Sequence, residues 1–144
     1  MNEISEKYSN TFAIVASILA LIGMGDAIYL VVHSLNGDQI PCGLTGGCGA
    51  VLSSQYSEIF GIPLAFFGVA AYFIAFCLAL LTAFGNSKLW NIFGLQVTFM
   101  VCFSAWLTYI QAFILLEYCQ YCLVSAAVCC SLFLVFIISK LLKK

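Results

Sequence analysis

Four of the eight cysteines form two closely spaced pairs, an arrangement that can act as a reactive dithiol. Cys42 and Cys48 are separated by the flexible segment Gly-Leu-Thr-Gly-Gly, which lets the two sulfurs meet and lets the pair move. Cys119 and Cys122 form a C-x-x-C motif at an expected helix start, where the helix N-terminus lowers the pKa of a thiol. The two pairs predict a relay in which electrons pass from a soluble thiol to the loop pair and then to the C-x-x-C pair.

The other four cysteines lie within long apolar stretches and share no motif. A buried free cysteine behaves as a small hydrophobic side chain, so we expect these four to pack within the membrane. They are Cys77, Cys102, Cys129 and Cys130.

The composition is that of a membrane protein. Hydrophobic residues make up 64% of the 144 residues and charged residues 8%, against about 25% charged residues in soluble domains. The net charge of −1 and the lack of arginine argue against a nucleic-acid partner. The sequence predicts an all-α membrane protein, a four-transmembrane-helix bundle that forms one domain over residues 1–144. The expected spans cover residues 12–32, 62–83, 89–116 and 118–142.

The lysines predict the orientation. With four spans, every lysine falls on one side of the membrane, and the positive-inside rule places that side and both termini in the cytoplasm. These residues are Lys7, Lys88, Lys140, Lys143 and Lys144. The loop over residues 33–61 then faces outward. Apolar residues follow Cys48 at roughly helical spacing, so we expect a short lid helix over residues 50–60, with a disordered loop as the alternative.

The position of the C-x-x-C pair at the membrane boundary favours a lipid-soluble electron acceptor. A quinone suits this position because it accepts two electrons and two protons and binds among apolar side chains with few polar contacts. Candidate contacts near the outer ends of the spans are Trp106, Tyr109, Gln111, Phe113 and Ser125. Aromatic residues at this level are also typical of the membrane interface.

Asp26 is a carboxyl group inside the first expected span, about 9 Å from its outer end at about 1.5 Å per residue. An intramembrane carboxyl group suggests a function. Asp26 could relay a proton to a reduced quinone, and the alternative is a structural hydrogen bond to a neighbouring helix. His33 is expected to be an interfacial surface residue.

Two other classes of function use the same cysteines. Four thiolates could hold zinc or copper in a non-catalytic metal-binding protein, although the five-residue spacing of the loop pair is wider than structural zinc sites usually have. A small transporter or assembly subunit with structural disulfides is the other alternative.

Several motifs in their order along the chain resemble the vitamin K epoxide reductase family. They are Gly25-Asp26-Ala27-Ile28-Tyr29-Leu30-Val31-Val32-His33, the Cys42-x5-Cys48 pair, Ala50-Val51-Leu52-Ser53-Ser54 leading to Phe60-Gly61-Ile62-Pro63-Leu64, and Tyr109-x-Gln111-x-Phe113 before Cys119-x-x-Cys122. The resemblance covers residues 12–142.

Resemblance to the bacterial members implies a disulfide-generating enzyme of the cytoplasmic membrane that reduces ubiquinone or menaquinone. It implies that Cys122 faces the quinone and that Cys119 exchanges with the loop pair. The partner expected is a periplasmic thioredoxin-fold oxidase of the DsbA kind, as a separate chain because no thioredoxin-like domain follows Lys144. The expected quinone contacts are Val51, Ser54, Tyr56, Phe60, Gln111, Ser125 and Ala126.

Two departures favour plain quinone reduction over vitamin K epoxide chemistry. Animal enzymes of the family have a tyrosine where this chain has Ala126, and their loop cysteines are spaced more widely. The DsbB family also uses four helices, but there the C-x-x-C comes first and the spaced pair second, the reverse of the order in this chain.

Overall fold

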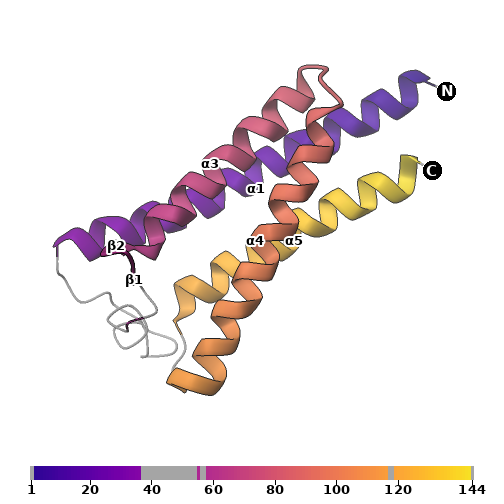
Figure 1. The fold of residues 1–144 in the computed structure, drawn as a ribbon. Coiled ribbons are helices and arrows are strands. Elements are labelled where there is room, and N and C mark those ends of the chain that lie inside the picture. The colour runs from indigo at the N-terminus through magenta and orange to yellow at the C-terminus, as the bar shows by residue number, and fades with distance from the viewer. Residues whose placement is uncertain (1, 37–54, 56–57, 117–118, 144) are drawn as a thin grey trace.

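Four long helices form the body of the molecule (Figure 1). The structure is a computed structural model that describes residues 2–36, 55, 58–116 and 119–143. In chain order the helices are α1 (Asn2–Asn36), α3 (Leu64–Ala83), α4 (Leu89–Tyr109), its continuation as the π-helix η2 (Ile110–Leu115), and α5 (Gln120–Lys143). Within the described residues, four helical segments are long and apolar enough to cross a membrane. The predicted all-α bundle of four spans is confirmed.

Helix α1 is longer than the span predicted for it. Its 35 residues correspond to about 52 Å at about 1.5 Å per residue, whereas the hydrocarbon core of a bilayer is about 30 Å thick. The predicted span over residues 12–32 is the middle of this helix. Asp26 lies ten residues before the end of the helix at Asn36.

A two-stranded hairpin leads into α3. Strand β1 (Glu58–Ile59) pairs antiparallel with β2 (Ile62–Pro63). Phe60 and Gly61 form the turn, and both have positive φ values, 54° and 78°. Two consecutive positive φ values are typical of a tight type I′ turn.

The hairpin corrects the prediction of a lid helix that ends at Phe60. Residues 58–60 are extended and then turn, because a right-handed helix cannot continue through a residue with positive φ. Pro63 is also extended, with φ −55° and ψ 136°, so the second span begins at Leu64. Residues 50–54 and 56–57, the rest of the predicted lid, lie outside the described residues.

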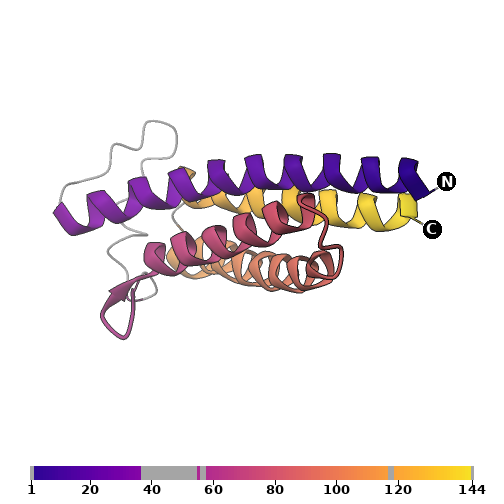
Figure 2. The same cartoon turned by 90° about the horizontal axis from the view of Figure 1, so that it is seen from above.

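The four helices surround a common interior (Figures 1 and 2). Helix α1 packs against α3 and α5, and α4 packs against the same two helices. Both termini and the turn between α3 and α4 lie at one end of the bundle, and the hairpin and the first turn of α5 lie at the other (Figure 1). The bundle thus separates the end that carries the termini from the end that carries the C-x-x-C motif.

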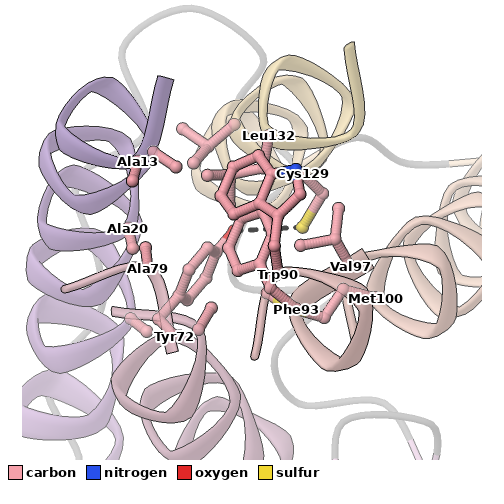
Figure 3. Close-up of a cluster of buried hydrophobic side chains, with 14 residues drawn as sticks. Ala13, Ala20, Tyr72, Ala79, Trp90, Phe93, Val97, Met100, Cys129 and Leu132 are labelled. Carbon is pink, nitrogen blue, oxygen red and sulfur yellow. Dashed lines mark hydrogen bonds between the residues drawn. The ribbon is translucent and has the colours of Figure 1, made fainter. Parts of the chain in front are cut away.

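Small residues and aromatic rings build different parts of the core. Ala13, Ala16 and Ala20 of α1 are fully buried, and side chains of this size let two helices in a membrane approach closely. In the same core Trp90 stacks on Phe93, with ring centroids 4.7 Å apart (Figure 3). Small side chains therefore allow close helix contacts along α1, whereas large aromatic rings fill the core around the start of α4.

Gly94 of α4 is needed where this aromatic cluster meets α5. A Cβ atom at Gly94 would overlap the ring of Phe136, which itself packs against Trp90 with centroids 5.9 Å apart. By contrast, a Cβ atom at Gly25 of α1 would meet nothing within 4 Å among the described residues.

We expect opposite effects on stability from alanine at these two glycines. Gly94→Ala should lower the free energy of unfolding by about 1–3 kcal/mol, since the Phe136 ring must move out of a packed core. Gly25→Ala should raise it by up to about 1 kcal/mol, because alanine favours the helix and has room. Denaturant unfolding in detergent micelles, followed by circular dichroism, measures both. Equal stability of the two variants would contradict the packing described.

Candidate functional site

Cys119 caps the N-terminus of α5. Its carbonyl oxygen accepts a hydrogen bond from the backbone N–H of Leu123 at 3.1 Å, and its sulfur accepts hydrogen bonds from the backbone N–H groups of Tyr121 and Cys122. A side-chain acceptor at this position satisfies N–H groups that have no partner within the helix. Cys119 is fully buried, Cys122 is half-buried, and both are free thiols.

Hydrogen bonds lower the pKa of the Cys119 thiol to about 7. The largest effect comes from the Cys122 thiol, which donates to the Cys119 sulfur, and the backbone N–H groups of Cys122 and Tyr121 add to it. Such donors favour the thiolate. Burial and the nearby charge of Asp26 act in the opposite direction. At neutral pH, Cys119 is therefore present in part as the thiolate, the form that attacks a disulfide.

Gln111 holds the C-x-x-C segment against the end of the third span. Its side-chain oxygen accepts a hydrogen bond from the backbone N–H of Cys119 at 3.1 Å, and the residue is buried. Gln111 lies in η2, which ends at Leu116 in the left-handed conformation with φ 53°. Single-turn π-helices are frequent at functional sites. Here the π-helical turn carries the side chain that fixes Cys119.

A partly open cavity of about 330 Å³ lies among the helices, towards the end with the C-x-x-C motif. All four long helices, η2 and the hairpin contribute to its wall. Its surface is mostly apolar, with aromatic side chains from α3 and α4 such as Phe67, Phe99 and Phe103. Cys122 lines this cavity and Cys119 does not. The two sulfurs of the motif therefore face different surroundings.

Asp26 is the acidic group of α1 that lines the cavity. One of its carboxylate oxygens, Oδ2, is buried and has no hydrogen-bond partner among the described residues. A buried polar atom without a partner is costly, so such an atom in a cavity wall is a candidate ligand contact. Glu58 of the hairpin lines the same cavity.

A hydrogen-bonded group that the sequence analysis did not identify lies in the cavity wall. The hydroxyl of Tyr72 is 2.7 Å from the hydroxyl of Ser125. It is also 3.2 Å from the sulfur of Cys129 (Figure 3). The hydroxyl of Ser104 donates to the same sulfur at 3.5 Å. Cys129 was expected to pack only as a hydrophobic residue. The available signal was Tyr72 itself, a phenol in an apolar span that needs a partner.

Several candidate quinone contacts lie away from the cavity. Phe60 is 98% exposed at the hairpin turn. Ala126 follows Ser125 on α5 and does not line the cavity that Ser125 helps to form. Among the candidates within the described residues, the structure brings Gln111 and Ser125 together with Cys122 and Asp26 at the cavity. Three aromatic candidates are exposed on the outside of the bundle: Trp106, Tyr109 and Phe113.

An aromatic cluster lies beside the C-x-x-C motif. Tyr29 of α1 packs between His33, at a centroid distance of 4.4 Å, and Tyr121, at 5.1 Å. Tyr121 is one of the two residues between Cys119 and Cys122. His33 is half-buried in this contact, where we had expected a surface residue. The cluster attaches the start of α5 to the end of α1.

Comparison with known proteins places the chain in a family. Residues 14–137 match the vitamin K epoxide reductase family. The chain belongs to this family. It is also 35% identical over 120 residues to the thiol-disulfide oxidoreductase LTO1 of Arabidopsis thaliana. That match covers 76% of this chain and 32% of LTO1, so the chain spans about a third of the length of this relative.

Five residues that the sequence analysis assigned to the site of this family member lie outside the described residues. They are Cys42, Cys48, Val51, Ser54 and Tyr56. Among the residues that the structure does describe, no three His, Cys, Asp or Glu side chains are grouped to hold a metal ion.

The pKa of Cys119 predicts the pH dependence of its alkylation in the reduced protein. The rate should rise as pH increases and level off above a midpoint near 7, because the thiolate is the form that reacts. Cys122→Ala removes the main hydrogen bond and should move the midpoint up by about one unit, towards the ordinary value of about 8.5. Mass spectrometry of the peptide that contains Cys119 gives the rate. The same midpoint in both proteins would exclude Cys122 as the cause.

Proposed function

We propose that this chain is a thiol–disulfide oxidoreductase that passes electrons from a thiol partner to a quinone. The observation that carries this proposal is that the two cysteines of the C-x-x-C motif have different surroundings. Cys119 caps the helix and has a lowered pKa, whereas Cys122 lines the mostly apolar cavity within the bundle. Such a pair can exchange with a disulfide through one sulfur and meet a lipid-soluble oxidant at the other.

The cavity fits the ring of a quinone in size and in lining. A volume of about 330 Å³ is within the usual range of about 300–1,000 Å³ for small-molecule sites. The apolar wall carries a few polar groups, among them Ser125 and the unpartnered oxygen of Asp26. These residues would hold the ring, and Gln111 would contribute its amide group while its oxygen stays on Cys119.

The proposed redox step transfers two electrons and two protons from the Cys119–Cys122 dithiol to the quinone. Closing the Cys119–Cys122 disulfide forms one S–S bond and releases two electrons and two protons, and a quinone takes up both to become a hydroquinone. The Cys119 thiolate is already populated at neutral pH. Asp26 is placed in the wall of the same cavity and would relay a proton from the dithiol side.

The loop pair and the partner complete the proposal. Cys42 and Cys48 would receive electrons from a thioredoxin-fold partner of the DsbA kind and pass them to Cys119 by disulfide exchange. Val51, Ser54 and Tyr56 would add contacts to the quinone, which would be ubiquinone or menaquinone. The similarity to LTO1, a thiol-disulfide oxidoreductase by its name, supports this chemistry.

We place the protein in a bacterial cytoplasmic membrane, with both termini in the cytoplasm. Lys88 precedes α4, and Lys140 and Lys143 lie in the last turn of α5, so these lysines share the end of the bundle that carries the termini. The positive-inside rule assigns this end to the cytoplasm, and the C-x-x-C motif then faces outward.

Replacing the sulfur that lines the cavity tests the proposed function. Cys122→Ser should abolish quinone reduction by the purified protein with a dithiol donor, because the disulfide can no longer close. Cys130→Ser, on the exposed side of the same helix, should leave the rate unchanged. The absorbance of the quinone gives the rate. Quinone reduction retained by Cys122→Ser would sink the assignment.

Elemental analysis of the same preparation tests the alternative of a metal-binding protein. We expect no stoichiometric metal. Zinc or copper near one ion per chain, lost in Cys119→Ser, together with no reduction of any quinone, would favour the alternative.

Asp26→Asn tests the proton relay. The amide keeps the shape and polarity of the side chain but cannot titrate, so we expect the rate of quinone reduction to fall by about 10²-fold or more. Glu58→Gln, at the hairpin, serves as a matched variant of the other acidic group in the cavity wall. Full turnover of Asp26→Asn would reduce Asp26 to a structural role.

A further inference from the structure

The hydroxyl of Ser125 is held differently from several other hydroxyls in these helices. Thr98, Thr108 and Ser131 each donate a hydrogen bond to the carbonyl oxygen four residues earlier in their own helix, at 2.7–2.9 Å. This arrangement is usual for such residues inside helices. The hydroxyl of Ser125 instead lies 2.7 Å from the hydroxyl of Tyr72, which comes from α3.

A gap on α1 lets the Tyr72 ring reach across the bundle. Gly23 lies against this ring, and a Cβ atom at that position would overlap three ring carbons. The ring is buried, and its hydroxyl reaches Cys129 of α5 (Figure 3) and the Ser125 hydroxyl one turn earlier. Three helices therefore cooperate in placing a single hydroxyl group.

The hydrogen bonds around Tyr72 can be arranged in two ways. In the closed arrangement, Tyr72 donates to the carbonyl oxygen of Ser125 at 2.9 Å and the Ser125 hydroxyl donates to Tyr72. In the open arrangement, Tyr72 donates to the Ser125 hydroxyl, whose own proton then becomes available to the cavity. Cys129 can donate to the Tyr72 oxygen in either arrangement, because its sulfur accepts from Ser104 and its own proton stays available. A chain of donors that point the same way strengthens its last member.

We infer that Tyr72 is a positioning residue that turns the Ser125 hydroxyl proton towards a carbonyl oxygen of the bound quinone. This inference rests on the proposed function and adds a specific contact to it. Ser125 and Cys122 both line the cavity, three residues apart on α5, so Ser125 lies about 4.5 Å deeper along the helix. The reacting sulfur and the hydrogen-bond donor are then stacked on one face of α5.

Kinetics of three variants test the inference. Tyr72→Phe and Ser125→Ala should each raise the KM for quinone by about three- to tenfold, the loss of one neutral hydrogen bond, with little change in kcat. The double variant should be no worse than Ser125→Ala alone, because both changes remove the same contact. Ser125→Thr keeps the hydroxyl and should restore most of the affinity. Tyr109→Phe, which removes an exposed hydroxyl on α4, is the control.

The infrared spectrum of the bound quinone gives a readout that loss of packing alone would not move. A carbonyl stretching band should shift to higher frequency in both Tyr72→Phe and Ser125→Ala. Gly23→Ala, which displaces the Tyr72 ring, should behave in the same way, whereas Gly25→Ala should match the unmodified protein. If Tyr72→Phe does not fold, the pair Ser125→Ala and Ser125→Thr and the Gly23→Ala spectrum decide the question.

Different outcomes separate this inference from the proposed function. Quinone reduction with unchanged KM and an unchanged carbonyl band in Tyr72→Phe would overturn the inference and leave the proposed function standing. An additive effect in the double variant would also overturn it, since Ser125 would then act without Tyr72. Failure of the unmodified protein to reduce any quinone would overturn both.

Discussion

The capping of α5 by Cys119 is the interaction on which the site depends. A helix leaves its first N–H groups without partners, and where the helix start is buried these groups need partners within the protein. The sulfur of Cys119 accepts two of these N–H groups, and Gln111 accepts the backbone N–H of Cys119 itself. The bonds that complete the fold at this point also stabilise the thiolate. Structural and chemical demands are therefore met by the same atoms.

The start of α5 also places the two sulfurs of the motif in different surroundings. Cys119 lies at the cap and Cys122 lies in the first turn, where it reaches the cavity wall. One thiol belongs to the end of the bundle and the other to its interior. This division is the feature on which we base the proposed transfer of electrons from a thiol partner to a quinone.

Buried polar groups mark the functional end of an otherwise apolar bundle. Tyr72, Ser125 and Cys129 satisfy one another across α3 and α5, as buried polar groups must. Asp26 also lines the cavity, but its Oδ2 atom is buried with no hydrogen-bond partner among the residues described. The two polar groups thus differ in whether the described residues satisfy them.

The sequence by itself determined the spans, the helix start at the C-x-x-C motif and the family, because hydropathy and cysteine spacing are local properties of the chain. The tertiary structure decided that Tyr72 and Cys129 belong to the cavity wall and that Phe60 and Ala126 do not. The spans are apolar on every side, since they face lipid as well as one another, so no periodic pattern shows which side turns inward. That choice follows from how the helices pack, at contacts such as that of Gly23 with Tyr72.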